Sequence, residues 1–595
     1  MSYLITQSDI DLVRSRVQHA MLKIEILNED DTIYDTLVGY IDDGKSSIDG
    51  ESVNRRTFNV TLAPTHQSIS VCEDSLLWIN KEIKLYIGIK GIRDTDYHWF
   101  PQGRYIMVNS SGAYDVSKNT LTINCNDLMS KLDGTVNGQI GGASTVKISA
   151  YEEDENGNPI DNTYTIIREA LITIIRDLGG VNKFIIDDIG EYDGLEQYNP
   201  NYELYRNENP RWNCLPYDLE FSCGETVSKI ASDILGLYSN YDGAFDEDGV
   251  YVAKAIPSSQ SDPISISNDV IQSIFISESS SLDVSGIRNI CEVWGETIET
   301  DFYSEDCSST ISTIAFEGEN RVCTKYAVNV EQYGDIYTNN DVIGIRLSAT
   351  NSSEITAINI NNIGDIIVYD ENTGLPIQSD SLSADTIYAF KYKKELNSDK
   401  TYSYMFYLLG QWQPHALNVL TDGTVIENGY TDADGNVLDK YSLEYFMSKY
   451  NCECVSLTTI VNSPFTVQKI GERIDVKSGN EYDNIGSDSL ALARAEYENW
   501  KNCRLTDNIT ITTTLIPFVK EYMKISYSPV NSNDIEEYIV KNVIHNYKDG
   551  TTEITMYKFY PLYNENGERG TNEVLNKYTH KRLASYTHKQ VREFL

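Results

Sequence analysis

The chain has 595 residues, with 48 Lys and Arg against 89 Asp and Glu, and a formal net charge of −41. This charge argues against a conventional nucleic-acid-binding protein, because neutralising phosphates requires a surplus of Lys and Arg on one face. Hydrophobic residues make up 41% and charged residues 23%, a globular composition that argues against wholesale disorder. At roughly 150 residues per domain, the length indicates about three to five units.

The chain shows no sign of a membrane span or of disulfide bonding. No stretch reaches the ~18 consecutive apolar residues of a spanning helix, since the best candidate, 166–178, is interrupted by charged residues. The N-terminus lacks the basic region and apolar core of a signal peptide, so we expect a soluble protein made in a cytoplasm. Cys452 and Cys454 form the only close cysteine pair, and a disulfide between them would be strained, so we expect reduced thiols.

The composition favours a mainly β fold with a few helices. Tyr occurs 42 times against 15 Phe and 14 Pro, and Ile, Val and Thr recur in alternating runs. Asn, Asp, Ser and Gly interrupt these runs about every ten residues, as expected for short strands joined by turns. Small barrels or sandwiches are therefore the expected units.

The first unit, within residues 1–140, reads as a small β-barrel or sandwich. Partial apolar and polar alternation predicts strands at 21–27, 58–62, 83–89, 103–108 and 121–125. One helical turn over Asp127–Leu132, ending at Gly134, is predicted to close it.

Two helices are predicted in the next unit, 141–264. Residues 163–180 carry one apolar stripe and end at Gly179; the stripe consists of Ile167, Ala170, Leu171, Ile174, Ile175 and Leu178. Residues 225–238 carry a second stripe, consisting of Val227, Ile230, Ala231, Ile234 and Leu235. A hairpin is predicted to follow, with Phe245 and Val250 flanking its turn.

Strands again dominate residues 265–480, which read as a middle β-rich domain containing an insertion. A helix over 489–505 is predicted to bury a stripe of Leu490, Ala493, Tyr497 and Trp500. Strands at 509–514, 523–527, 538–546 and 553–559 then complete a helix-plus-barrel unit over 481–565, ahead of a basic tail at 566–595.

Four segments, in this order, resemble bacteriophage tail-hub proteins, the baseplate-hub or tail-tip family. The first unit is similar to that family's N-terminal barrel, with Gly103 and Tyr105 opening one strand and another strand leading into Asp127–Met129. The segment ETVSKIASDILGLYSNYDGAFDEDGVYVAKAIP resembles its helix-plus-hairpin, and FTVQKIGERIDVKSGNEYDNIGSDSLALARAEYENW its entry to the last barrel. The strands after residue 506 resemble its closing barrel.

The resemblance implies a structural virion protein at the tail tip or baseplate. It implies a homotrimer in which two similar barrels per copy present a pseudo-sixfold face to the tail tube or distal tail protein. The tape-measure protein and then the genome would pass through the ring, and the acidic walls would repel DNA without specific binding. Tip or receptor-binding proteins would be anchored to it. The acidity could equally serve solubility alone.

No catalytic, cofactor-binding or metal-binding residue is assigned, so we expect a non-enzymatic protein without cofactors. The histidines lack the spacing of a zinc hydrolase; they are His19, His66, His98, His415, His545, His580 and His588. No phosphate-binding loop or serine-hydrolase elbow occurs. About thirty residues follow Pro561, too few for the peptidase or muralytic domain that tail hubs of phages infecting Gram-positive hosts often carry there.

An alternative function remains open: a glycan-binding or glycan-cleaving protein directed at a cell surface. A carboxylate pair for glycan cleavage can be neither identified nor excluded among so many acids. Trp412 could contact a sugar, although a lone Trp is more often a packing residue. Two segments imitate calcium loops but lack the twelfth-position Glu, so hairpin turns are favoured over weak calcium sites; they contain Asp432, Asp434 and Asp439, and Asp154, Asn156, Asn158 and Asp161.

The C-terminal tail is basic on an otherwise acidic chain. Residues 572–595 contain Tyr-Thr-His-Lys twice, with Lys577, Lys581, Arg582, Lys589 and Arg592 against Glu573 and Glu593. A frayed helix or one folded back on the acidic surface is one interpretation, and a docking peptide for an acidic neighbour is the other.

Overall fold

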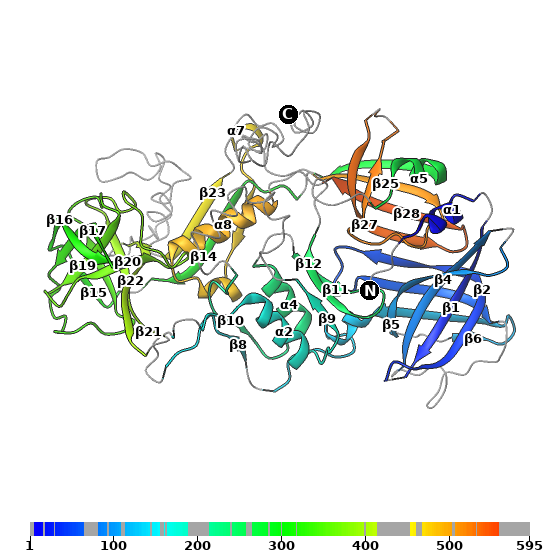
Figure 1. Ribbon diagram of the computed structural model, residues 1–595, viewed down its shortest axis with the longest axis horizontal. Helices are drawn as coiled ribbons and strands as arrows, with labels where there is room; N and C mark the ends of the chain where they lie inside the picture. Colours follow the sequence, from blue (N-terminus) through cyan, green and yellow to red (C-terminus); the bar gives the residue numbers. More distant parts are fainter. Residues whose placement is uncertain are drawn as a thin grey trace, which may run out of the picture.

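The computed structural model describes most of the chain between residues 5 and 558. Its gaps are 16–17, 29, 65–80, 92–93, 109–112, 143–144, 155–159, 161–162, 188–212, 238–240, 257–264, 284–285, 299, 317, 398–399, 413–452, 460–466, 503–505, 531 and 533. The described residues form many strands and few helices, which confirms the predicted mainly β fold (Figure 1).

The first unit is a closed ring of six strands behind a short helix, α1 (Gln7–Val13). Its strands are β1 (Gln18–Leu27), β2 (Ile33–Asp49), β3 (Arg56–Pro64), β4 (Glu82–Gly91), β5 (His98–Met107) and β7 (Thr120–Asp127), with β6 (Ala113–Asp115) paired to β7. The order is β1-β4-β5-β7-β3-β2, and β2 pairs back with β1. Alternation places Leu121, Ile123 and Cys125 of β7 in the interior. All five predicted strands are present.

Strand β2 was not predicted, and it links two parts of the molecule. Its first half pairs with β1, and its last five residues, Lys45–Asp49, lie between β3 and β27 (Glu536–Asn546). A register shift between Ile41 and Asp43, next to Gly44 at φ 125°, marks where it bends from one partner to the other.

The last β unit continues the same sheet beyond β2. Its strands follow in the order β27, β28 (Thr551–Lys558), β25 (Thr506–Thr514) and β13 (Phe275–Asp283), with β26 (Lys524–Tyr527) paired to β27. All four predicted strands are present. They are joined by β13, from within the predicted middle region, which follows α5 (Asn268–Ile274). One hydrophobic core, with members from Val13 to Met556, serves both β units.

A small helical unit lies beside the two β units. It contains the 3-10 turn η1 (Leu128–Lys131), β8 (Val146–Ile148), α2 (Ile167–Thr173) with a π-helical turn η2 (Ile174–Leu178), β9 (Phe184–Ile186), β10 (Leu219–Phe221), α4 (Val227–Leu235), β11 (Tyr241–Phe245) and β12 (Tyr251–Ala255). Thr226 caps α4 by accepting from the Lys229 amide. The five residues predicted to line α4's buried stripe are all buried.

Helix α8 (Asp488–Asn502) covers a three-stranded sheet of β23 (Glu453–Thr459), β14 (Ile290–Thr297) and β24 (Ile474–Lys477). Two short elements, α7 (Val467–Ile470) and the 3-10 turn η4 (Asn480–Asn484), precede it. Leu490 is buried as predicted. The side chains of Ala493, Tyr497 and Trp500 lie outside the described residues, so their burial stays a prediction.

An eight-stranded β domain forms the far end of the molecule (Figure 1). Its strands are β15 (Phe302–Ser304), β16 (Cys307–Phe316), β17 (Glu319–Val328), β18 (Val342–Arg346), β19 (Ile355–Ile360), β20 (Ile366–Asp370), β21 (Ile387–Leu396) and β22 (Tyr402–Gln411), in the sheet order β15-β18-β21-β22-β20-β19-β17-β16. It has its own core, containing Tyr326, Phe390 and Phe406. None of the described helices is long and apolar enough to cross a membrane.

Candidate functional site

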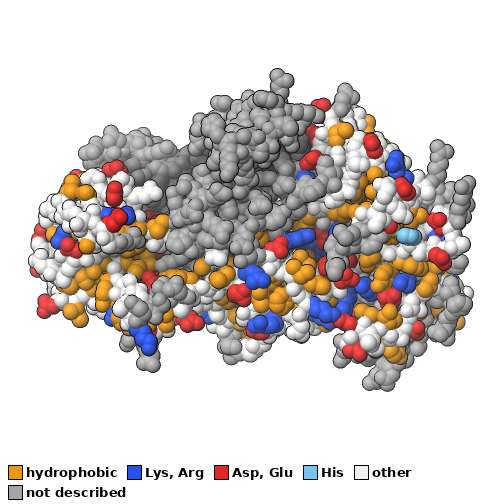
Figure 2. All heavy atoms as spheres, viewed as in Figure 1, with side chains coloured by type: hydrophobic (Ala, Val, Ile, Leu, Met, Phe, Trp, Pro, Cys, Tyr) orange, Lys and Arg blue, Asp and Glu red, His pale blue; other side chains and the backbone are white. Residues whose placement is uncertain are grey.

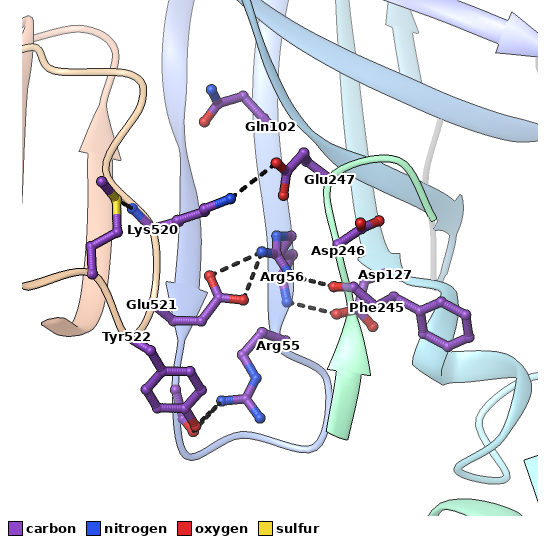
Figure 3. Close-up of polar contacts among 12 residues, drawn as sticks. Arg55, Arg56, Gln102, Asp127, Phe245, Asp246, Glu247, Lys520, Glu521 and Tyr522 are labelled. Carbon is purple, nitrogen blue, oxygen red and sulfur yellow. Dashed lines mark hydrogen bonds and ion pairs between the residues drawn. The ribbon is translucent and has the colours of Figure 1, made fainter. Parts of the chain in front are cut away.

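The candidate site is a buried network of charges where the first unit, the last unit and the β11–β12 hairpin meet (Figure 3). Two consecutive arginines lie at its centre: Arg55, just before β3, and Arg56, the first residue of β3, with side chains only 4% and 3% exposed. Burying two guanidinium groups is costly unless each is paired and hydrogen-bonded. The network supplies both kinds of partner.

Arg56 bridges all three parts of the structure. Its Nη2 donates to both carboxylate oxygens of Glu521 in the last unit, at 2.7 and 2.9 Å, and its Nη1 donates to the Phe245 carbonyl of the hairpin. Its backbone N–H donates to Asp127 Oδ2 at 2.8 Å. Burial is the largest single influence and would lower the pKa of Arg56, but Glu521, Tyr105, Glu247 and Asp127 together outweigh it, so the pKa is raised and the guanidinium stays charged.

Arg55 makes a second bridge beside the first. Its guanidinium pairs with Asp242 of β11 and donates to the Tyr522 hydroxyl at 3.0 Å. That hydroxyl donates to Asp242 Oδ2 at 2.6 Å. Tyr522 adopts φ 63°, a left-handed conformation that costs a non-glycine residue about 1–3 kcal/mol and persists only where surrounding contacts enforce it.

The hairpin turn adds further ion pairs to both β units. Lys520 of the last unit lies 3.1 Å from Glu247, and Lys84 of β4 lies 2.7 Å from Asp248. Ion pairs therefore join the turn of the hairpin to both the first and the last unit. A hydrogen bond also joins the first and last units directly, since Gln102 Nε2 donates to the Pro517 carbonyl at 2.8 Å.

Asp127 holds the end of β7 against Arg56. It caps η1 by accepting from the Met129 amide at 3.0 Å, in addition to the Arg56 amide. Burial raises the pKa of Asp127 to about 6, against the lowering effect of these hydrogen bonds and of the Arg56 charge. The helical turn predicted after β7 is thus confirmed as a 3-10 turn, and its N-cap, Asp127, belongs to the network.

Gly103 and Tyr105, noted in the sequence for their Gly-x-Tyr spacing, lie next to Arg56. Gly103 has φ 147°, and a Cβ there would lie 2.9 Å from Arg56 Cδ and from the Tyr105 ring. The Tyr105 hydroxyl donates to the Gln102 carbonyl at 3.1 Å, and its ring meets Phe58 edge to face at 4.7 Å. The absence of a side chain at Gly103 therefore leaves room for the Arg56 side chain and the Tyr105 ring.

We expect Gly103→Ala to lower the free energy of unfolding by about 1–3 kcal/mol, since the added methyl group strains the backbone and crowds Arg56. Gly141→Ala is the matched control, because a Cβ at that position meets nothing within 4 Å. Chemical denaturation of both variants measures the difference. Equal stabilities would contradict the role assigned to Gly103.

The charges of the network are matched by charges of opposite sign. Arg55, Arg56 and Lys520 are set against Asp242, Glu247 and Glu521, in addition to Asp127. The cavity beside it, lined by Phe100, Gln102 and Phe518 among others, has a volume of about 30 Å³, enough for about one water molecule. Among the described residues, no group of three His, Cys, Asp or Glu side chains is arranged to hold a metal ion. The arrangement is suited to fixing three segments in place.

Other candidate residues from the sequence are scattered or lie outside the described residues. Trp412 of the eight-stranded domain is partly buried; its ring lies 5.6 Å from the Tyr303 ring and packs over Gly344. The hydroxyl of Tyr402 contacts Asp154 at 3.1 Å. Outside the described residues lie Asn156, Asn158, Asp161, His66, His415, Asp432, Asp434, Asp439, Cys452 and the whole basic tail, and predictions on them remain predictions.

The network itself was not predicted. Its one visible signal is the Arg55–Arg56 pair before a strand in a chain poor in basic residues. Its partners lie far along the chain: Glu521 is 465 residues from Arg56, and Asp242 is 187 residues from Arg55. No local pattern connects residues at such distances.

Comparison with known proteins gives a family match over the end of the chain and similar solved structures over most of it. Residues 462–563 match a family described as a domain of unknown function, DUF5048. No curated protein matches the sequence.

Solved structures of tail proteins, two of them from prophages, are similar to this chain at low sequence identity. The 43 kDa tail protein of prophage MuSo2 from Shewanella oneidensis is 9% identical, with 90% of this chain and 98% of that chain covered and a TM-score of 0.38. A tail protein from Neisseria meningitidis is 6% identical, with 91% and 96% covered and a TM-score of 0.40. The prophage tail protein gp18 from Listeria monocytogenes is 8% identical, with 95% and 100% covered and a TM-score of 0.36.

Proposed function

We propose that this protein is a structural hub of a bacteriophage tail tip or baseplate, without catalytic activity of its own. The observation that carries the proposal is the fusion of the first and last β units into one body. They share a twelve-stranded sheet and one core, and they lie side by side (Figure 1). The buried charges around Arg56 tie both units to the hairpin between them.

A rigid pair of β units suits a ring that must match a tube above it. If three copies close a ring, each copy supplies two units and the ring presents six. Fixed spacing between the two units within a copy is then a requirement, and buried, bidentate ion pairs meet it better than a flexible linker would. The proposed partners are further copies of this chain, the tail tube or distal tail protein, the tape-measure protein and tip or receptor-binding proteins.

The net charge of −41 supports passage of DNA without binding. Each copy would add negative charge to the ring, and phosphates would be repelled from its inner wall. The glycan-directed alternative receives no comparable support, since Trp412 is used in packing between Tyr303 and Gly344. The proposed location is the virion, after synthesis in the host cytoplasm.

Imaging of assembled tails tests this proposal. We expect averaging without imposed symmetry to show three copies in one ring at the distal end of the tube, each with two β units against it. The fit of the first and last β units into that density measures whether they occupy equivalent positions. A single copy, a ring of six copies, or absence of the protein from tails would overturn the proposal.

A further inference from the structure

The feature that leads beyond the hub is the seam between the first and last β units. Among the described strands, one pairing joins the two units, in which Lys45–Asp49 of β2 runs antiparallel to residues 542–546 of β27. The strand-to-strand ladder across the seam is therefore only five residue pairs long. A change at this short ladder acts directly on how the two units are held together.

One row of side chains crosses the seam inside the shared core. The strand registers place Thr552 of β28 beside His545 of β27, His545 beside Ser46 of β2, Ser46 beside Phe58 of β3, and Phe58 beside Cys125 of β7. Thr552, His545 and Ser46 are all buried. The row is therefore polar at the point where it passes from the last unit to the first, although the core around it is hydrophobic.

The imidazole of His545 has one hydrogen bond in this row. Its Nδ1 lies 3.0 Å from the Thr552 hydroxyl, and its Nε2 is buried without a hydrogen-bond partner among the described residues. The Ser46 hydroxyl is engaged instead with the Tyr547 hydroxyl, at 2.5 Å. A protonated imidazole carries a charge and has two N–H donors, so it requires a second acceptor. The described side of the seam offers none at Nε2.

The charged side chains of the neighbouring strands lie on the other face of the sheet. Side chains alternate along a strand, so Lys45, next to Ser46, and Glu553, next to Thr552, point away from His545. Figure 2 shows Lys, Arg, Asp and Glu side chains on the surface of both β units, outside the shared core. The surroundings of His545 therefore supply no counter-charge from β2 or β28.

The titratable groups on the core side are Tyr547, Tyr105 and Cys125. Burial raises the pKa of each of them, so all three are neutral at and below neutral pH. Burial also lowers the pKa of His545 to about 4 from an ordinary value of 6.5, and no nearby charge offsets this effect. His545 is therefore neutral while the seam is closed at neutral pH.

We propose that the seam is an acid-sensitive switch, in which protonation of His545 separates β27 from β2 and uncouples the last unit from the first. The charged ring gains hydration only when β27 moves away from β2, because a buried charge without a partner is costly. The first unit stays intact, since β2 also pairs with β1 and closes its own ring. In a tail hub, opening would release the fixed spacing of the two units. The inference concerns a single chain and holds whether or not copies form a ring.

The direction of the pH effect follows from the protons bound in each state. The open seam binds a proton at His545 that the closed seam excludes, so the closed state loses stability as pH falls from about 6.5 to about 4. Asp127, whose pKa burial raises to about 6, has the opposite sign, because the folded state holds its proton more tightly than the unfolded chain does. A substitution at position 545 separates the two contributions.

Hydrogen exchange of the full chain between pH 7 and pH 5, corrected for the intrinsic exchange rates, measures the opening. We expect the protection of residues 45–49 and 542–546 to fall roughly twentyfold over this range in the wild type. The pairing of β1 with β4, in the same first unit, should stay protected. In His545→Gln, which keeps a hydrogen-bonding group beside Thr552 but does not titrate, protection of the seam should no longer depend on pH. His19→Gln is the matched control, because His19 of β1 is exposed, and this variant should behave as the wild type.

Three results would overturn the proposal. They are equal protection of the seam at pH 7 and pH 5 in the wild type, the same pH dependence in His545→Gln as in the wild type, and simultaneous loss of protection in the β1–β4 pairing, which would indicate unfolding of the whole unit. An NMR titration of the histidine rings in the wild type needs no variant. A His545 ring that titrates near 4 supports the proposal, and one that titrates near 6.5 overturns it.

Discussion

Replacing Arg56 by methionine is expected to lower the free energy of unfolding by about 3–5 kcal/mol. The substitution keeps most of the side-chain volume but leaves the Glu521 carboxylate and the Phe245 carbonyl without their donor. Breaking one side of a buried ion pair is strongly destabilising because the remaining charge stays buried without compensation. Chemical denaturation at neutral pH measures the effect.

Arg176→Met is the matched control for this prediction. Arg176 also makes two hydrogen bonds to one carboxylate, at 2.6 and 3.0 Å to Asp177, but its side chain is 48% exposed. An exposed pair contributes little to stability because water screens it. The difference between the two variants therefore isolates burial. If both cost the same, the network around Arg56 does not hold the two β units together.

The second large effect is expected at the first residue of α8. Asp488 Oδ2 accepts from the Gln411 amide at 3.3 Å, and Oδ1 is buried without a hydrogen-bond partner among the described residues. Burial raises the pKa of Asp488 to about 8 from an ordinary value of 3.8. The carboxyl group is therefore protonated in the folded protein at neutral pH, and ionised in the unfolded chain.

This difference in protonation makes folding less favourable as pH rises. The folded state binds a proton that the unfolded state has lost, so stability is highest below about pH 4 and falls until about pH 8. Asp488→Asn removes the titration while keeping the shape. Its stability relative to the wild type should rise from near zero at pH 4 to on the order of 5 kcal/mol at pH 8.

Denaturation curves of the Asp488→Asn variant and the wild type between pH 4 and 8 measure this gain. Asp483→Asn is the control, since this nearby side chain is exposed and its replacement should change stability by less than about 0.5 kcal/mol throughout. A constant difference between the Asp488→Asn variant and the wild type across the pH range would show that Asp488 is not desolvated.

Sequence patterns predicted the elements whose environment is uniform along their length. Helix α4 buries one face only, so its five buried residues follow from helical spacing. Strand β2 was missed because it changes partners midway and its register shifts between Ile41 and Asp43, which breaks alternation. That the first and last β units superpose as similar barrels stays a prediction. Among the described strands the first unit closes into a ring, whereas the strand order of the last unit ends at β13.

The candidate site was only partly visible in the sequence. Gly103, Tyr105 and Asp127 were noted for their order along the chain, and their common role around Arg56 emerges only in three dimensions. Charged residues without periodic spacing carry no signal of burial, so Arg55 and Arg56 read as ordinary surface residues. The domain boundaries also stay predictions, although the pairing of β13 with β25 ties part of the predicted middle region to the last unit.

Because β2 pairs with β3 on one side and with β27 on the other, its sheet is completed only after the C-terminal strands have been synthesised. Ser46 of β2 and Tyr547, just past the end of β27, lie 501 residues apart in the chain, yet their hydroxyl groups are 2.5 Å apart in the fold. At ~5–20 residues per second, a ribosome needs roughly 25–100 s to make the intervening chain. During that interval Lys45–Asp49 has β3 on one side and an open edge on the other, so the nascent first unit depends on protection from premature strand pairing until its C-terminal partner emerges.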